Sequence, residues 1–359
     1  MQNTLLKGYE DRKWTEGNLA DVDPGRYLQP FLINRFDFSL KARTSNSLLL
    51  LDLDNTITDT RRWFADCILD LTAELALALG EEHSLINEVF AQVATATTLH
   101  EYAYMVEVIA HRLESHKKVS FKYLRNISQL FWMRFLEHHQ RIELYHGVIE
   151  TLVEIRVRYP ALKIVILTDS PEWIALERLA LVGVLPLVDG VVAIRSEAPN
   201  LKHTGYRSGI KVVKERLEFM QSRLKRSHLK LNLAVPASFA KPSAAGIELI
   251  TKRLGVSSAE LIIVGDKDGK EGLAAANWRR YKSIVSGGNP AIHFVRAEYG
   301  NHDIADSRYS HLSKQIRSLK APTAAVIPEI PLRRSINKFA EILDTVDEVF
   351  SCRAETIQL

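Results

Sequence analysis

Two aspartates, Asp52 and Asp54, follow directly on a short apolar run at residues 48–51. Such a run is typical of a buried parallel strand, so the aspartates would lie at its carboxyl end. Carboxylates there can hold a hard divalent cation through oxygen, and one of them can attack phosphorus to form an acyl phosphate. A single Asp at a strand end is more often a turn residue or a helix cap. The pair therefore gains weight only from the residues that accompany it.

Further polar residues stand at the ends of other expected elements. Thr168 and Asp169 follow a second apolar run, Lys241 begins an expected helix, and Asp266 follows a third apolar run. In an open parallel sheet the carboxyl ends of the strands meet at one crevice, where ligands bind. Carboxylates, a lysine and a hydroxyl suit phosphoryl transfer, because a cation and a lysine neutralise the phosphoryl oxygens in the transition state.

The elements that must position these residues form an α/β pattern. Residues 61–140 have the apolar spacing of four amphipathic helices, with almost no strand signal. After them strands and helices alternate, which implies a parallel sheet covered by helices on both faces. We therefore expect a Rossmann-like core, residues 47–60 and 141–300, into which an α-helical cap, residues 61–140, is inserted. Pro171 is expected at the first position of a core helix.

The remaining segments flank this core or interrupt it. Residues 1–46 are expected to be an N-terminal extension packed on the core. Residues 301–359 are expected to complete the core, with a possible strand at 324–327 and a closing helix from Ile336 to about Val346.

Residues 201–230 form a basic insert, which contains nine Lys and Arg residues and only two Glu. An apolar stripe of helical spacing favours a packed helix with a cationic outer face. The alternative is a surface for a polyanion such as nucleic acid. The pattern of aromatic residues does not support base stacking, so nucleic acid is possible but not favoured as a partner.

Four sequence motifs, taken in order, resemble those of the haloacid dehalogenase-like superfamily over roughly residues 47–300. Each stands at the expected end of a strand or helix, which makes the set far more specific than one Asp-x-Asp pair. The chain is identified on this resemblance as a member of the phosphatase branch with a helical cap. The motifs are Asp52-Leu53-Asp54-Asn55-Thr56, Leu167-Thr168-Asp169, Lys241-Pro242 and Val264-Gly265-Asp266.

The resemblance implies a role for each motif residue. Asp52 would be the nucleophile and a ligand of Mg²⁺. Asp54 would be the general acid and base, with its backbone carbonyl on the metal. Lys241 would bridge the nucleophile and the phosphate, and Thr168 and Asp169 would help to bind the phosphate.

The metal site would be completed by Asp266. In the family a second acid, most often an Asp, stands four or five residues further on. Here Lys270 and Glu271 occupy those places, so Glu271 is the expected partner and Asp268 the reserve. Thr56 would stabilise the loop of the first motif.

Asp54 narrows the reaction that the resemblance implies. Haloacid dehalogenases lack an acid at this position, whereas phosphatases and phosphomutases use one. We therefore expect an enzyme that hydrolyses a small-molecule phosphate monoester through an aspartyl-phosphate intermediate, with Mg²⁺ as cofactor. A phosphomutase, which uses the same acid, stays open, and so do two other classes. One is a phosphatase acting on a nucleic-acid end or another macromolecular phosphate, and the other is a non-catalytic relative that serves binding.

Composition agrees with a globular cytoplasmic enzyme. Hydrophobic residues make up 46% of the chain and the formal net charge is +4, values that permit a sizeable core. No run of about twenty apolar residues suggests a membrane span, and charges stand near the start where a signal peptide needs an apolar core. The two cysteines have no metal-type spacing. Nothing in the pattern indicates an oligomeric state.

Overall fold

The structure is a computed structural model, and the expectations for residues 1–46, for most of 201–230 and for a strand at 324–327 fall outside its described part. The described residues are 47–115, 118–140, 142–197, 214–215, 218–220, 222, 229–256, 260–288, 290–300, 312 and 329–350.

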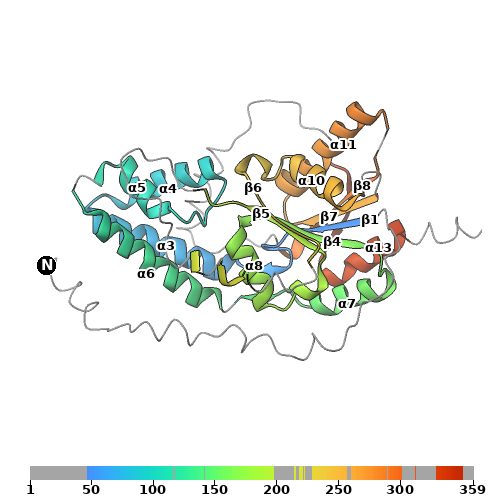
Figure 1. Ribbon diagram of the computed structural model, residues 1–359, viewed down its shortest axis with the longest axis horizontal. Coiled ribbons are helices and arrows are strands. Elements are labelled where there is room, and N and C mark those ends of the chain that lie inside the picture. The colour runs from blue at the N-terminus through green and yellow to red at the C-terminus, as the bar shows by residue number, and fades with distance from the viewer. Residues whose placement is uncertain are drawn as a thin grey trace, which may run out of the picture. The chain divides into compact units, whose positions relative to one another are not determined.

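A seven-stranded parallel sheet, in the order β6-β5-β4-β1-β7-β8-β9, lies at the centre of the described fold (Figure 1). β1 is the middle strand and pairs with β4 on one side and β7 on the other. The α/β sheet predicted from the sequence is thereby confirmed. The strands are β1 (Ser47–Leu51), β4 (Lys163–Pro171), β5 (Gly190–Ile194), β6 (Leu231–Val235), β7 (Glu260–Gly265), β8 (Ile292–Ala297) and β9 (Leu332–Ile336).

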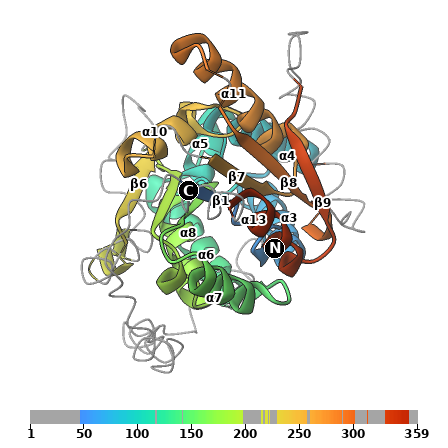
Figure 2. The ribbon, with the colours of Figure 1, turned by 90° about the vertical axis from the view of Figure 1, so that its right-hand side faces the viewer.

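The apolar run of β1 is buried on both faces of the sheet. Leu48 and Leu50 belong to one hydrophobic cluster, and Leu49 and Leu51 belong to another. Successive strand residues point to opposite faces, so an uninterrupted run of leucine requires a cover on each side. Figure 2 shows these helical layers on either side of the sheet. α10 (Ala245–Leu254) and α11 (Leu273–Ser286) contribute to the first cluster, and α7 (Val148–Arg158), α8 (Glu172–Leu181) and α13 (Ile342–Phe350) contribute to the second.

Four helices lie between β1 and α7 and are called the helical insert below. The insert begins after β2 (Thr58–Asp59) and ends before β3 (Glu143–Leu144), and these two short strands pair antiparallel. The chain therefore leaves and re-enters the sheet region at one place. No helix among the described residues is long and apolar enough to cross a membrane. The helices of the insert are α3 (Arg61–Leu79), α4 (His83–Thr97), α5 (Met105–Arg112) and α6 (Phe121–His139).

Two elements near the chain's end differ from the expectation. Leu332–Ile336 forms the edge strand β9, where the sequence analysis expected no strand. The helix α13 begins at Ile342, after the short turn η8 (Phe339–Glu341), and not at Ile336. The reason is that the apolar Ile336 belongs to the end of β9, where it pairs with Ala297 of β8.

One acidic side chain is buried inside the insert. Glu107 of α5 is only 4% exposed, and its carboxylate accepts a hydrogen bond of 3.2 Å from the Ser128 hydroxyl of α6. Burial, which outweighs the hydrogen bonds and the nearby Arg125, raises the pKa of Glu107 to about 7. Folding therefore takes up a proton at this carboxyl between its ordinary pKa of 4.5 and about 7.

We expect the free energy of unfolding to fall as the pH rises from about 4.5 to about 7. In this interval the folded protein binds the proton that the unfolded chain has lost, so the loss amounts to about 3 kcal/mol. Glu107→Gln should remove this slope and stabilise the protein above neutral pH. Denaturant titrations of both proteins at several pH values measure it. If Glu107→Gln left the pH dependence of the free energy of unfolding unchanged, other groups would have to cause it.

Candidate active site

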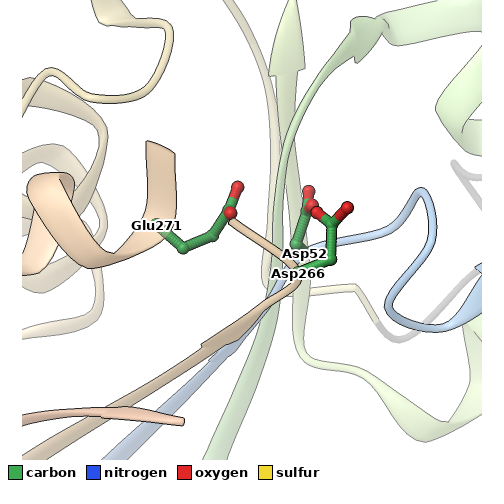
Figure 3. A group of neighbouring side chains, drawn as sticks. All are labelled: Asp52, Asp266 and Glu271. Atoms are coloured by element: carbon green, nitrogen blue, oxygen red, sulfur yellow. The ribbon is translucent and has the colours of Figure 1, made fainter. Parts of the chain in front are cut away.

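The expected site residues converge at the carboxyl ends of β1 and β7. Asp52 follows β1 and Asp266 follows β7, and the Asp52 amide donates to Val264 O at 2.9 Å. Glu271 stands in the turn η6 (Asp268–Gly272), before α11. Figure 3 shows the three carboxylates directed toward one another. Because β1 and β7 are neighbours in the sheet, the fold places the first and fourth motifs side by side.

These three carboxylates form a compact buried cluster. Each of Asp52, Asp266 and Glu271 is buried and offers an oxygen within 4.8 Å of the other two. The Lys241 ammonium lies 2.5 Å from Asp52 Oδ1, to which it donates a hydrogen bond, and 2.5 Å from Glu271 Oε1. The cluster therefore combines three acidic groups with a single buried ammonium.

The electrostatics of the cluster favour a bound cation. Burial is the largest influence on Asp52 and raises its pKa well above the usual value; Glu271 and Asp266 raise it further, while Lys241 opposes them. Burial alone would lower the pKa of Lys241, but the carboxylates raise it well above its usual value. Lys241 thus stays charged. The Lys267 ammonium also lies 3.6 Å from Asp266 Oδ2, so the three carboxylates of the cluster outnumber these two ammonium groups. Buried carboxylate oxygens in such an arrangement fit a hard divalent cation.

Glu271, and not Asp268, reaches the cluster. Asp268 points elsewhere, because its carboxylate accepts a 2.8 Å hydrogen bond from Arg296. Gly265 leaves the space that the Glu271 side chain occupies, because a Cβ at position 265 would lie 2.1 Å from Glu271 Cγ. The geometry thus agrees with the preference for Glu271 in the sequence analysis.

The second motif contacts the third. Asp169 accepts a hydrogen bond of 2.9 Å from the Lys241 amide and another of 2.9 Å from the Lys270 ammonium. Burial would raise its pKa, but Lys270 and Lys241 together lower the pKa of Asp169 to about 2. The buried Thr168 hydroxyl accepts from the Ser170 amide at 3.0 Å. Asp169 thus holds the Lys241 backbone, and its expected part in phosphate binding stays a prediction.

Two expected helix starts are wrong. Pro171 is not the first helical residue: it still pairs with Ile194 of β5, and α8 begins at Glu172. Lys241 does not begin a helix either, because α10 begins at Ala245. Lys241 instead stands in a turn after η5 (Ala237–Phe239), where Asp169 accepts from its amide.

A short turn supports the loop of the first motif from behind. In the helical turn η7 (Glu298–Gly300), the Tyr299 hydroxyl donates to Thr56 O at 2.8 Å, and a Cβ on Gly300 would lie 1.7 Å from Asn55 O. Asn55 itself adopts a left-handed conformation, with φ 61°. The Thr56 hydroxyl has no hydrogen-bond partner within the described part of the chain. Thr56 is thus held through its carbonyl, by a residue that the sequence analysis did not identify.

Asp54 has unexpected partners. Its Oδ1 accepts from Arg178 of α8 at 2.5 Å, and its Oδ2 accepts from the Ser170 hydroxyl at 2.5 Å. Arg178 also forms an ion pair with Glu101 of the insert. The sequence analysis missed these residues. A signal in the sequence was the charged pair Glu177-Arg178, which interrupts the apolar run at residues 173–181.

Comparisons with known proteins bear on the family. The family model for haloacid dehalogenase-like hydrolase matches residues 47–277. A comparison with curated proteins found no match. Among solved structures, a predicted phosphoglycolate phosphatase from Haemophilus somnus is 15% identical, with 85% of this chain and 100% of that chain covered and a TM-score of 0.44.

Two further solved structures have similar values. A HAD phosphatase from Thermococcus onnurineus is 15% identical, with coverage of 84% and 97% and a TM-score of 0.45. A 2-haloacid dehalogenase from Pseudomonas syringae is 14% identical, with coverage of 84% and 98% and a TM-score of 0.44. The family model covers well over half of the chain, and the chain belongs to the haloacid dehalogenase-like hydrolases.

Proposed function

We propose that this hydrolase is a Mg²⁺-dependent phosphatase that hydrolyses a small-molecule phosphate monoester through an aspartyl phosphate on Asp52. The observation that supports it most is the Asp52 carboxylate itself. It lies in a buried cluster with Asp266 and Glu271, touches the Lys241 ammonium, and is followed two residues later by the acid Asp54. Phosphoryl transfer requires such a nucleophile, positive charge beside it and an acid near the leaving group.

The proposed reaction has two steps. An Asp52 oxygen attacks phosphorus, the bond from phosphorus to the leaving oxygen breaks, and Asp54 gives its proton to that oxygen. A water oxygen then attacks phosphorus, Asp54 takes the proton, and the bond to Asp52 breaks to release phosphate. The division replaces one hard displacement with two easier ones. Lys241 keeps positive charge beside Asp52 in both steps.

Asp52, Asp266 and Glu271, with the Asp54 carbonyl, would hold Mg²⁺. When bound, Mg²⁺ supplies charge that offsets the negative phosphoryl oxygens. Oxygen ligands of this kind suit Mg²⁺, and the excess of acidic groups over ammonium in the cluster supports a divalent ion.

Glu271→Gln should raise the Mg²⁺ concentration needed for half-maximal activity at least about tenfold. Asp268→Asn is the matched control, because it stands in the same turn but pairs with Arg296. Its Mg²⁺ requirement should stay close to that of the unchanged protein. A larger effect from Asp268→Asn than from Glu271→Gln would mean that the metal site is built from the other acid.

In this proposal the helical insert acts as a cap over the reacting groups. A cap excludes water and contacts the leaving group, and a covered site favours small substrates over macromolecular ones. Contacts between the insert and the Asp54 region support this assignment, because Glu101 of the insert pairs with the arginine that holds Asp54.

A panel of phosphate monoesters tests the proposal. The purified protein should hydrolyse a generic aryl phosphate and a subset of small esters with Mg²⁺, and a chelator should abolish the activity. Hydrolysis confined to phosphorylated nucleic-acid ends or phosphoproteins would favour the macromolecular alternative. Inactivity towards the whole panel with Mg²⁺ would reject the phosphatase and point to a binding protein. Release of halide from haloacids would contradict the role given to Asp54.

A further inference from the structure

Arg178 of α8 joins side chains from the sheet region and from the helical insert. It is 1% exposed, and its guanidinium donates to Asp54 Oδ1 at 2.5 Å, to the Ser170 hydroxyl at 3.1 Å and to His139 Nε2 at 3.0 Å. It also forms a hydrogen-bonded ion pair with Glu101. Asp54 and Ser170 follow strands of the sheet or end them, whereas Glu101 and His139 belong to the insert.

The charge of Arg178 is balanced from both sides. A buried guanidinium is tolerated only when hydrogen-bonded carboxylates compensate for its lost hydration. Asp54 supplies one carboxylate and Glu101 supplies the other. Glu101 is itself buried, with 7% of its surface exposed. Moving the insert away would break the ion pair between Arg178 and Glu101, so that each would lose the other as its partner. The position of the insert and the pairing of Arg178 therefore depend on each other.

Both oxygens of Asp54 are held by this network. Arg178 occupies Oδ1, and the Ser170 hydroxyl donates to Oδ2. The same hydroxyl lies 3.2 Å from Glu101 Oε2, and having one proton it donates to one carboxylate at a time. When Asp54 carries on Oδ2 the proton that it gives to the leaving group, the Ser170 oxygen accepts from it and the hydroxyl donates to Glu101. Two donors at fixed positions restrict rotation of the Asp54 carboxylate. Glu101 contacts both donors, so an insert residue influences how Asp54 is held.

Aromatic packing adjoins the network at His139, whose ring centroid lies 5.7 Å from that of Phe135 on α6. The rings of Trp132 on α6 and Trp173 on α8 lie edge to face, with centroids 5.1 Å apart. The Tyr102 hydroxyl, next to Glu101, donates to Glu197 O at 2.7 Å. Two parts of the insert, α6 and the segment between α4 and α5, are therefore seated on the sheet region. Such close packing around buried polar groups strengthens their interaction, because water is excluded.

We propose that Arg178 is a positioning residue that couples the placement of the helical insert to the orientation of the Asp54 carboxylate. The coupling deepens the proposed function and rests on it where Asp54 is given the role of acid and base. Arg178 touches no reacting atom in this account. Glu101 is the insert's contribution to the coupling.

The first test needs no activity. In Glu101→Gln, amides of residues 53–58 should exchange with deuterium several-fold faster than in the unchanged protein. The matched control is Glu107→Gln. Glu107 is a buried glutamate of the same insert, and the Ser128 hydroxyl that donates to it also belongs to the insert. The control should not make this exchange faster. Equal exchange of residues 53–58 in the two variants would overturn the coupling.

The second test separates positioning from folding. A poor leaving group depends on protonation by Asp54 more than a nitrophenolate does. Glu101→Gln should therefore lower kcat/KM roughly tenfold for an alkyl phosphate and far less for nitrophenyl phosphate. The comparison uses kcat/KM because kcat also contains the later hydrolysis of the aspartyl phosphate, in which Asp54 acts as base whichever ester supplied the phosphoryl group. Arg178→Lys, which keeps the charge without the forked donors, should behave alike. Equal losses on both substrates would contradict the proposal.

The outcomes distinguish the two proposals. If Glu101→Gln is insoluble, Ser170→Ala, which removes the hydroxyl between Asp54 and Glu101, is measured in the same two ways and carries the same expectations. Faster exchange in a protein without phosphatase activity would reject the proposed function and keep the coupling. Unchanged exchange in an active phosphatase would reject the coupling and keep the function.

Discussion

Replacing Asp52 by Asn is expected to reduce turnover of an aryl phosphate on the order of 10⁴-fold or more, because the amide cannot form the covalent intermediate. The substitution keeps the size of the side chain, and its oxygen can still accept from Lys241. The loss should therefore appear in kcat without unfolding. Steady-state kinetics with nitrophenyl phosphate and Mg²⁺, beside a thermal melt, measure both.

Asp70→Asn is the control for this substitution. Asp70 is an exposed carboxylate on α3, so the same chemical change there should leave kcat and KM unaltered. If Asp52→Asn kept a substantial part of the activity, another group would have to be the nucleophile. The cluster around Asp52 would then serve the metal alone.

Replacing Lys241 by Met is expected to lower both the stability and the activity of the protein. The buried ammonium is in contact with Asp52 and Glu271, and its removal leaves three buried carboxylates without it. Losing one partner of a buried pair costs about 3 to 5 kcal/mol of stability. The cost should be largest in chelator at high pH, because the carboxyls can take up protons at lower pH. The activity of Lys241→Met should fall at least about a hundredfold, because the ammonium beside Asp52 is lost.

Mg²⁺ should restore part of the stability lost by Lys241→Met, since a cation bound to the folded state stabilises it by mass action. Lys270→Met is the control: this lysine is near the site, but it pairs with Asp169 and is 36% exposed. Its stability loss should be smaller. Thermal melts with Mg²⁺ and with chelator compare the two. Equal losses, neither relieved by Mg²⁺, would mean that the Lys241 contacts do not form part of a metal site.

The sheet and the two aspartates of the cluster, Asp52 and Asp266, were predictable from local sequence, whereas Glu271 was expected only from the family resemblance. Asp52 and Asp266 each follow an apolar strand, and strand order alone brings two such ends together. β9 was not predictable in this way, because its sequence, LRRSI, has charged residues at an exposed edge and lacks the apolar alternation of a covered strand. β1 is buried along almost its whole length and β9 is mostly exposed, which explains why only β1 has an apolar sequence.

The partners of Asp54 could not be predicted, because they come from distant parts of the chain. Glu101 and Arg178 are separated by 77 positions, and they meet only through the packing of the insert on α8. No spacing rule describes such a contact. The turn that carries Tyr299 behind the first motif is a similar case, at 243 positions from Thr56. Local patterns thus identify the reacting groups, whereas the residues that hold them depend on the tertiary fold.

In the proposed reaction Asp52 receives the phosphoryl group. The most direct test is peptide mass analysis of Asp54→Asn protein, quenched in acid during turnover of nitrophenyl phosphate with Mg²⁺. This variant should still transfer phosphoryl to Asp52, because nitrophenolate leaves without a proton, but should release it slowly. We predict one added phosphoryl group on the peptide that contains Asp52. A phosphoryl group on another residue, or none during continued turnover, would contradict the account.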